Sequence, residues 1–272
     1  MIKFPDCKIN IGLNILSKRE DGYHNLQTIF YPIPLNDVLE IVELPGQPST
    51  IRFTSSGLTI DATSDNNLCV RAARILQRDF PHIPGLTIHL HKNIPMGAGL
   101  GGGSADAAFV LLMINEKFQL RLSEAQLIAY ALQLGSDCPF FIRNQPCFAT
   151  GRGEIMEPLA IDLSGYELLL INPGIHVNTG GAFAGLHLSA HSPDLKAAVA
   201  APIHTWKNNI RNDFEQTVFQ QYPEIAAVKA SLYANGAVYA SMSGSGSTVY
   251  GIFEKGDQPA VNFPSHYFCQ WV

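Results

Sequence analysis

The sequence predicts an α+β protein in which strands and helices are grouped rather than strictly alternating. Residues 8–16 alternate apolar and polar side chains, which is typical of a strand. Near the middle of the chain, a strand at 86–91 leads through a glycine-rich loop into a helix at 105–118. A second helix at 124–134 follows, instead of another strand. With 272 residues, the chain is long enough for two modest domains.

Composition and charge limit the classes of function. A hydrophobic fraction of 46% with 15% charged residues indicates a compact globular protein. The sequence has no apolar run near about 18 residues and no basic, apolar leader, so we expect neither a membrane span nor secretion. Five scattered cysteines without a C-x-x-C pair favour reduced thiols in a cytoplasmic protein. A net charge of −5 without a basic cluster argues against nucleic acid as a partner. We expect a monomer or weak homodimer.

The first strand, at residues 8–16, has two different faces. Its apolar face consists of Ile9, Ile11, Leu13 and Ile15. Lys8 and Asn10 project together from the opposite face, two residues apart. This polar face is either part of a binding site or a solvent-facing strand surface, and the alternation alone fits both.

A charged turn at 17–24 connects this strand to a second one at 26–33. Asp21-Gly22 is a typical connection between antiparallel strands. Tyr23 and His24 follow directly, where binding residues often lie, although a single histidine at such a place is more often an ordinary surface residue. Further strands are predicted at 37–44 and 50–54.

A helix of about 13 residues follows Asn67, whose side chain is expected to cap it. The strand at 86–91 comes next and leads into the glycine loop. Five of the eleven loop residues are glycine, and a helix begins near their end. Backbone N–H groups and the positive end of a helix dipole make such a loop a phosphate-binding site. The loop consists of Pro95, Met96, Gly97, Ala98, Gly99, Leu100, Gly101, Gly102, Gly103, Ser104 and Ala105.

Three other kinds of loop come close to this pattern. Gly97, Gly99 and Gly102 satisfy the dinucleotide pattern G-x-G-x-x-G, but that fold requires a strand after the helix, and here a capping box at 123–126 starts another helix. The P-loop pattern nearly fits, but Gly103 stands at the position of its lysine. A flexible linker is disfavoured, because the loop joins a buried strand to an apolar helix.

Asp137 lies between the end of the second helix and the apolar run 138–142. A carboxylate in such a place is expected to be partly buried, and a buried carboxylate needs a partner or a task. The alternative is a turn-forming aspartate before Pro139.

The C-terminal part of the chain is predicted to form a second domain, with the boundary placed between residues 155 and 156. Two histidines, His187 and His191, have the spacing of a zinc-binding pair, but without a third ligand a surface pair is favoured. A second Gly/Ser loop at 242–247 either helps to hold a ligand between the two domains or is the tip of a loose hairpin. Strands are predicted at 147–155, 166–172, 238–241, 248–253 and, at a sheet edge, 266–272; helices are predicted at 179–188, 193–200, 213–220 and 223–234.

Three motifs together resemble the GHMP kinase superfamily. They are P-D-C-K-I-N-I-G-L at 5–13, P-M-G-A-G-L-G-G-G-S-A-D-A-A at 95–108 and S-M-S-G-S-G-S-T-V-Y at 241–250. Within the superfamily, the stretches R-E-D-G-Y-H-N-L-Q-T-I-F and L-G-S-D-C-P-F-F, together with the triple glycine at 101–103, are most similar to the kinases of 4-diphosphocytidyl-2-C-methyl-D-erythritol. Other GHMP kinases, acting on homoserine or mevalonate, are the nearest alternative, and an RNA-binding module is a more distant one.

The resemblance implies a fold and a set of roles. The fold would be an N-terminal domain like ribosomal protein S5 domain 2 and a ferredoxin-like C-terminal domain. The activity would be ATP-dependent, Mg²⁺-assisted phosphorylation of the C2 hydroxyl of the cytidylyl substrate in isoprenoid precursor biosynthesis. Lys8 and Asp137 match the catalytic pair. The loop Pro95–Ala105 matches the ATP phosphate loop, to which Asn67 and Lys92 would add contacts. The substrate would be met by Asn10, Tyr23, His24, Thr179 and Phe183.

Overall fold

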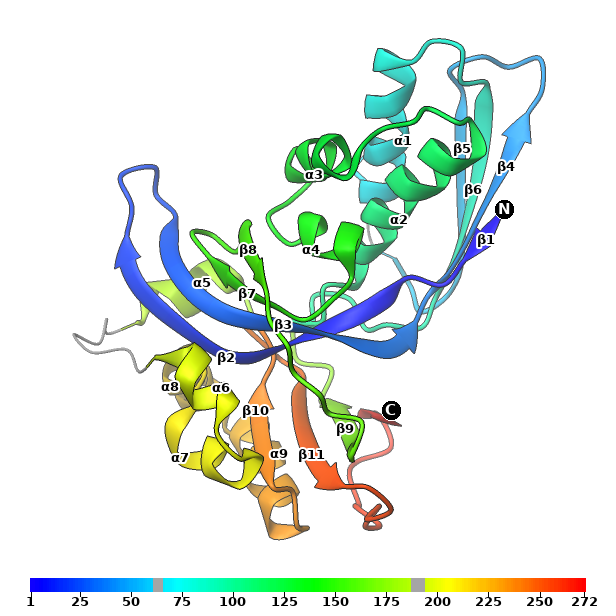
Figure 1. Ribbon diagram of the computed structural model, residues 1–272. Coiled ribbons are helices and arrows are strands. Elements are labelled where there is room, and N and C mark those ends of the chain that lie inside the picture. The colour runs from blue at the N-terminus through cyan, green and yellow to red at the C-terminus, as the bar shows by residue number, and fades with distance from the viewer. Residues whose placement is uncertain (61–65, 187–193) are drawn as a thin grey trace. The chain divides into compact units, whose positions relative to one another are not determined.

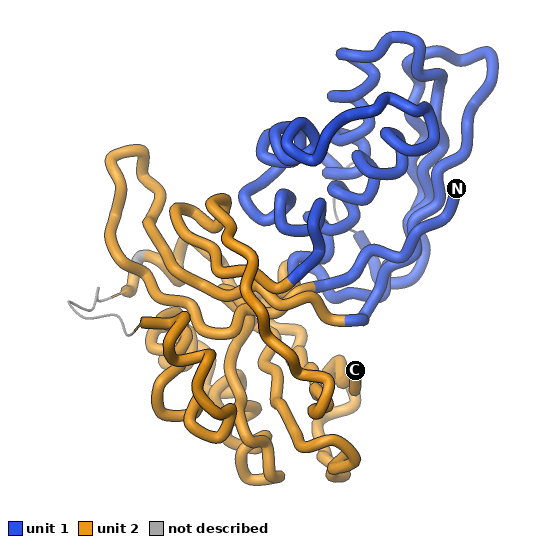
Figure 2. The backbone as a smooth tube through the Cα atoms, viewed as in Figure 1, with its two compact units in different colours: residues 1–7, 34–96, 101–145 blue, residues 8–33, 97–100, 146–272 orange. Residues whose placement is uncertain are grey.

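The computed structural model describes residues 1–60, 66–186 and 194–272, and these residues form two compact units (Figure 2). The first unit consists of residues 1–7, 34–96 and 101–145, and the second of residues 8–33, 97–100 and 146–272. The units are therefore assembled from interleaved segments. The boundary placed between residues 155 and 156 is a single cut in sequence order and stays a prediction.

Both units mix helices and strands (Figure 1). The strands are β1 (Ile2–Lys3), β2 (Asp6–Lys18), β3 (His24–Asn36), β4 (Val38–Leu44), β5 (Ile51–Gly57), β6 (Gly85–Lys92), β7 (Cys147–Thr150), β8 (Ile155–Pro158), β9 (Tyr166–Asn172), β10 (Tyr239–Met242), β11 (Val249–Glu254) and β12 (Phe268–Trp271). The α-helices are α1 (Leu68–Asp79), α2 (Gly102–Lys117), α3 (Glu124–Leu132), α4 (Cys138–Arg143), α5 (Thr179–Ala184), α6 (Leu195–Ala200), α7 (Trp206–Asn209), α8 (Phe214–Gln221) and α9 (Pro223–Ala234), and a 3₁₀ helix (Ile203–Thr205) precedes α7.

The first unit is a four-stranded sheet, ordered β1-β4-β6-β5, with helices packed along one face (Figure 1). β4 runs antiparallel to β6, while β5 runs parallel to it. The core between the sheet and the helices consists of side chains that include Leu39, Ile41, Leu86, Ile88, Ala72, Leu76, Val110, Leu111 and Ile114. Burial of each large aliphatic side chain stabilises the unit by about 1.5–3 kcal/mol.

Local signals in the sequence start the helices of this unit. Asn67 accepts a hydrogen bond from the N–H of Cys69 and caps α1, as the sequence predicts. The capping box of Ser123 and Gln126 is formed at the start of α3, which confirms that a helix and not a strand follows α2.

The second unit contains a sheet ordered β10-β11-β9-β12 and most of a sheet ordered β2-β3-β7-β8. β12 lies at the edge of its sheet, as predicted. The aliphatic face of β2 is fully covered: Ile9, Ile11, Leu13 and Ile15 are at most 4% exposed. Helices α8 and α9 contribute to the same core as β9 and β11, through residues such as Phe214, Val218, Val228 and Leu232.

Two of the predicted elements differ clearly from the structure. The stretch 147–155 is two short strands, β7 and β8, that pair as a hairpin, because Gly151 and Gly153 adopt positive φ in the turn. α5 is shorter than predicted and ends at Ala184. The histidine pair, His187 and His191, lies outside the described residues. Among the described helices, none is long and apolar enough to cross a membrane.

Candidate active site

Lys8 projects from β2 into the interior of the second unit, and its side chain is only 3% exposed. Its ammonium group donates hydrogen bonds to Oδ1 of Asn10 at 2.6 Å and to the carbonyl of Gly99 at 3.1 Å. The ammonium also lies 5.1 Å from the centre of the Phe30 ring. The polar face of β2 is therefore buried, and the alternative of a solvent-facing strand surface is wrong.

Asn10 connects this strand to the second Gly/Ser loop. Its backbone N–H donates to Oγ of Ser243 at 3.1 Å, and the Ser243 hydroxyl donates to the carbonyl of Gly99 at 2.8 Å. The Asn10 side chain donates to Oγ1 of Thr28 at 2.8 Å. Lys8 and Ser243 thus share one acceptor, the Gly99 carbonyl, in the middle of the glycine loop.

The two glycine-rich loops contact each other backbone to backbone within the second unit. A Cβ on Gly99 would lie 2.0 Å from the Ser243 carbonyl oxygen, and one on Gly244 would lie 3.2 Å from the Gly99 Cα. The N–H of Thr248 donates to the carbonyl of Ala98 at 3.2 Å. Ser243, Ser247 and Thr248 are fully buried, so the loop 242–247 is no loose hairpin tip.

The glycine loop passes directly into α2. Gly101 is the N-cap of this helix with φ +71°, a conformation that glycine adopts at little cost, and it offers no side chain to the first turn. The N–H groups of residues 102–104 lack carbonyl partners within the helix, because an α-helix leaves its first N–H groups unpaired. With the helix dipole, they form an electropositive end suited to a phosphate.

Lys92 lies at the end of β6 in a buried charge cluster of the first unit. Its ammonium is bound by a carboxylate oxygen of Asp37 and by Oδ2 of Asp106 at 2.8 Å, and all three residues are at most 2% exposed. A Cβ on Gly102 would lie 2.9 Å from the Lys92 Nζ, so the cluster lies directly against the first residue of α2. Burial raises the pKa of Asp106 to about 7. A contact of Lys92 with ATP stays a prediction.

Asp137 stands at the N-cap position of α4 in the first unit and is half-buried, as the sequence predicts. Its side chain does not cap the helix. The neighbouring thiol of Cys138 is buried, which raises its pKa to about 11, and it contacts the hydroxyl of Ser104. Lys8 belongs to the second unit, and its pairing with Asp137 stays a prediction.

The predicted substrate residues Tyr23, His24 and Phe183 all lie in the second unit. The His24 ring stacks on the Phe183 ring, with centroids 4.4 Å apart and planes 11° apart. Burial, followed by the charge of Lys18, lowers the pKa of His24, so its ring is neutral near pH 7. Tyr23 is 54% exposed and carries the guanidinium of Arg152 over its ring at 4.6 Å.

Thr179 and Asn67 occupy different local environments. Thr179 begins α5, and its hydroxyl lies 3.0 Å from that of Ser245, so the segment carrying Phe183 contacts the second Gly/Ser loop. Asn67 is 7% exposed, and its side-chain oxygen is engaged in capping α1. Their roles in substrate and ATP binding stay predictions.

Comparison with known proteins gives the family. The GHMP kinases N terminal domain matches residues 67–145, and the GHMP kinases C terminal domain matches residues 195–261. The 4-diphosphocytidyl-2-C-methyl-D-erythritol kinase of Bacteroides thetaiotaomicron is 50% identical over 272 residues, which cover 99% of this chain and 98% of that protein. The chain belongs to the GHMP kinases.

Solved structures agree with this membership. A crystal structure of 4-(cytidine 5'-diphospho)-2C-methyl-D-erythritol kinase matches with a TM-score of 0.80 and 32% identity, covering 93% of this chain and 90% of that one. A homoserine kinase from Cytophaga hutchinsonii matches with a TM-score of 0.67 over 93% of this chain and 86% of that one, but at 15% identity this likeness shows the fold alone. The predicted two-domain GHMP kinase fold is confirmed.

The structure of this GHMP kinase also shows partners of the candidate site residues that the sequence does not single out. In the sequence, Ser243 is only part of a Gly/Ser loop, and Asp37 is only the start of a predicted strand. For Asp106 the sequence gives a weak indication of a buried ion pair, because an acid in the first two turns of an otherwise apolar helix needs a partner. Arg152, which covers the Tyr23 ring, gave no signal beyond its position between two glycines.

Proposed function

We propose that this GHMP kinase transfers the γ-phosphoryl group of ATP to the C2 hydroxyl of 4-diphosphocytidyl-2-C-methyl-D-erythritol, in the synthesis of isoprenoid precursors. The observation that carries the proposal is the buried ammonium of Lys8, bound to the carbonyl of Gly99 within the glycine loop. The 50% identity, over nearly the full length of both chains, to a kinase named for this substrate supports the choice of acceptor.

Lys8 and Asp137 act on the acceptor hydroxyl in this proposal. Asp137 takes the proton of the hydroxyl, and Lys8 keeps the carboxylate ionised and orients the hydroxyl for attack. Because an alcohol is a far weaker acid than an aspartic acid, the proton leaves late in a loose transition state. Alignment of donor and acceptor therefore contributes more to the rate than proton removal does.

The glycine loop binds the nucleotide phosphates through the N–H groups at the start of α2. The described residues contain no cluster of three or more His, Cys, Asp or Glu side chains, and Mg²⁺ does not need one, because it binds mainly through nucleotide phosphates and water. Ser104 stands where a P-loop places its metal-binding hydroxyl, so it would hold the ion together with the phosphates. The ion would supply charge neutralisation of the β- and γ-phosphates.

The acceptor is tested by measuring ATP consumption with three alcohols in parallel: the cytidylyl substrate, mevalonate and homoserine. We expect turnover with the cytidylyl substrate alone, and a product whose phosphorus spectrum shows a new phosphate monoester on the tertiary C2 oxygen. Faster turnover with either of the other two acceptors would contradict the proposal and favour another GHMP kinase activity.

The proposal includes the compartment, the type of partner and the oligomeric state. All five cysteines are free thiols, four of them buried, which fits a reducing cytoplasm. The net charge of −5 supports a small-molecule partner over nucleic acid. We expect a monomer or weak homodimer, which light scattering during size-exclusion chromatography measures directly.

A further inference from the structure

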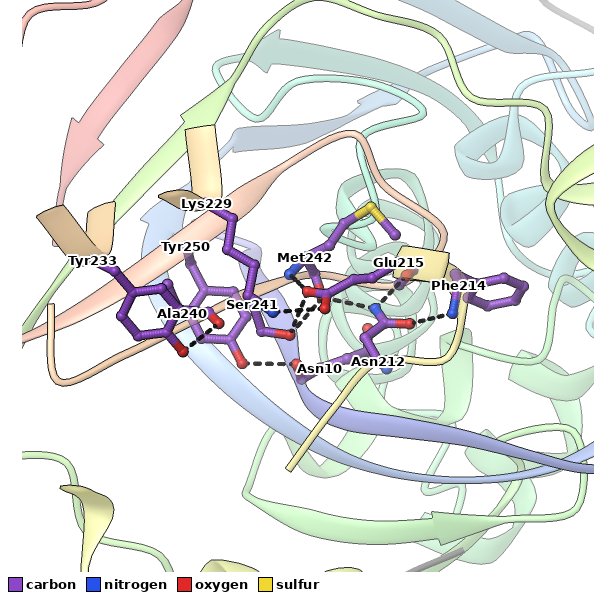
Figure 3. Close-up of polar contacts among 11 residues, drawn as sticks. Asn10, Asn212, Phe214, Glu215, Lys229, Tyr233, Ala240, Ser241, Met242 and Tyr250 are labelled. Atoms are coloured by element: carbon purple, nitrogen blue, oxygen red, sulfur yellow. Dashed lines mark hydrogen bonds and ion pairs between the residues drawn. The ribbon is translucent and has the colours of Figure 1, made fainter. Parts of the chain in front are cut away.

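The segment before α8 also holds the second Gly/Ser loop. Asn212 is 2% exposed, and its Nδ2 donates to the carbonyls of Met242 at 2.8 Å and Gly244 at 2.7 Å. Its Oδ1 accepts from the N–H of Phe214 at 3.0 Å, which fixes the orientation of the amide (Figure 3). Both amide hydrogens are therefore directed at the carbonyls of the two residues that flank Ser243.

Glu215, three residues after Asn212, also binds this loop. Its Oε1 accepts from the backbone N–H of Met242 at 2.9 Å, and its Oε2 pairs with the Lys229 ammonium at 2.6 Å (Figure 3). The carbonyl and the amide of Met242 are thus both bound by side chains from one short stretch of chain. A loop held at both kinds of backbone group has little freedom to shift.

The same stretch is also tied to β2, the strand that carries Lys8. Leu13 donates its N–H to the Arg211 carbonyl at 2.9 Å, and its own carbonyl accepts from the Asp213 N–H at 2.8 Å. Residues 211–213 therefore hold the strand and the loop in a fixed relation. Ser243 belongs to this loop, and its hydroxyl donates to the Gly99 carbonyl that also accepts from Lys8.

We propose that Asn212 is a positioning residue for phosphoryl transfer, acting through Ser243 on the Gly99 carbonyl and on the Lys8 ammonium. The inference rests on the proposed function, because it presumes that Lys8 and the glycine loop serve the transfer. The side-chain amide of Asn212 is buried and is engaged with backbone groups, so it acts through the loop. It fixes the carbonyls of Met242 and Gly244, the residues on both sides of Ser243, so that the hydroxyl can hold Gly99 in the orientation that Lys8 requires.

The variant Asn212→Asp tests this idea with almost no change in shape. A carboxylate in place of the amide loses both donors and faces two carbonyl oxygens, so the loop is released from this side. We expect kcat to fall by about tenfold or more, because small displacements of reacting groups are costly. We also expect the Kd for ATP to rise by at least about threefold, while the KM for the cytidylyl substrate changes less than about threefold.

Val218→Ala is the matched control. Val218 is fully buried on α8 in the same core, and its apolar side chain can form no hydrogen bond with the loop, so its truncation lowers Tm by loss of packing. We expect its kcat and Kd for ATP to stay within about twofold of the wild type at an assay temperature well below both Tm values. If Asn212→Asp matches this control in kcat and in Kd, the positioning role is overturned.

A second variant covers the possibility that Asn212→Asp does not fold. Ser243→Ala removes only the hydroxyl that links the loop to Gly99, and it should reproduce the loss of kcat; wild-type kcat in Ser243→Ala overturns the inference. If both variants fold, the kcat of the double variant should be no lower than that of the less active single variant. If the wild-type protein binds ATP but does not phosphorylate the cytidylyl substrate, the proposed acceptor is wrong. The comparison of Kd values for ATP then still decides the role of Asn212.

Discussion

Lys8 is the residue whose environment says most about the chemistry. A cation that is 3% exposed must be bound by dipoles or charges, and here two of its acceptors are the Asn10 side chain and the Gly99 carbonyl. The carbonyl belongs to the glycine loop, so the ammonium is placed beside the segment proposed to carry ATP. If this residue served only to stabilise the fold, an apolar side chain would cost less free energy to bury than an ammonium group does.

The catalytic pair gives the first prediction. Asp137→Asn or Lys8→Ala should lower kcat by about 10²-fold or more, because each removes a group that acts on the transferred proton or orients the hydroxyl. The Kd for ATP, measured by titration calorimetry, should stay nearly intact. Near-normal turnover in purified Asp137→Asn would remove the base assignment from Asp137.

Tyr23 gives the second prediction. Its ring is 54% exposed, so its removal should cost the fold little, whereas stacking on cytosine is worth about 1–3 kcal/mol per base. Tyr23→Ala should therefore raise the KM for the cytidylyl substrate by about tenfold, with a smaller change in kcat. Tyr23→Phe, which keeps the ring, is the control and should resemble the wild type. A loss confined to kcat is incompatible with a stacking role.

At the scale of elements, the glycine loop is constrained far more at some positions than at others. Gly99 has φ +78°, and any side chain there would collide with the Ser243 carbonyl. Gly103, in the first turn of α2, would meet nothing within 4 Å. Two glycines of one motif therefore serve different purposes, one for close contact between loops and one for an open helix terminus.

Comparison of Gly99→Ala with Gly103→Ala gives the third prediction. Gly99→Ala should destabilise the protein by more than about 1–2 kcal/mol, the cost of a left-handed residue before the collision is added. It should also lower kcat, because Lys8 and Ser243 lose a fixed acceptor. Gly103→Ala should leave Tm unchanged or slightly raised, since alanine favours the helix. Equal Tm values for the two variants, in thermal unfolding followed by circular dichroism, would show that Gly99 is not held as described.

At the scale of the whole molecule, the cluster of Lys92, Asp37 and Asp106 is a buried charge network that bears on global stability. Oδ1 of Asp106 has no hydrogen-bond partner among the described residues, and burial raises the pKa of this carboxyl to about 7. The groups that face it are the Lys92 ammonium, the Asp37 carboxylate and the thiol of Cys69, whose own pKa is raised well above its usual range by burial.

The pH dependence of unfolding is the fourth prediction. The folded-state pKa of Asp106 lies above its unfolded value, so the folded protein binds more protons between about pH 4 and pH 7. The contribution of Asp106 to the free energy of unfolding is thus present below pH 4 and is lost as the pH rises through 7, by at most about 1.4 kcal/mol per pH unit. The free energy of unfolding of Asp106→Asn, measured in urea at several pH values, should lack this decline. The effect is the difference between the variant and the wild type in the slope of this free energy against pH. Identical slopes would show that Asp106 is ionised throughout.

Much of the fold could be predicted from local patterns. The alternation of residues 8–16 predicted β2, Asn67 predicted the start of α1, and the capping box at 123–126 excluded a dinucleotide fold. These features are encoded in neighbouring residues, so a short window of sequence is enough to find them. Shorter or glycine-broken stretches, such as 147–155, were predicted less well, because positive φ at two glycines turned one expected strand into a hairpin.

The candidate site was predicted in part. Glycine spacing at the start of an apolar helix predicted a phosphate loop, and family resemblance assigned roles to Lys8 and Asp137; both stay predictions. Only the structure shows that the two Gly/Ser loops touch, because the residues that meet, Gly99 and Ser243, are 144 positions apart. The partners of Lys92 escaped prediction for the same reason, since Asp37 lies 55 positions away.

The sequence by itself determined which side chains of β2 share a face and where the capped helices begin, since backbone geometry and capping act over a few residues. The tertiary structure alone decided that the polar face of β2 is buried, and that Asn10, Ser243 and Gly99 meet around Lys8. Periodicity of two cannot tell which face is covered, because the covering residues come from distant segments brought together by burial of the apolar core.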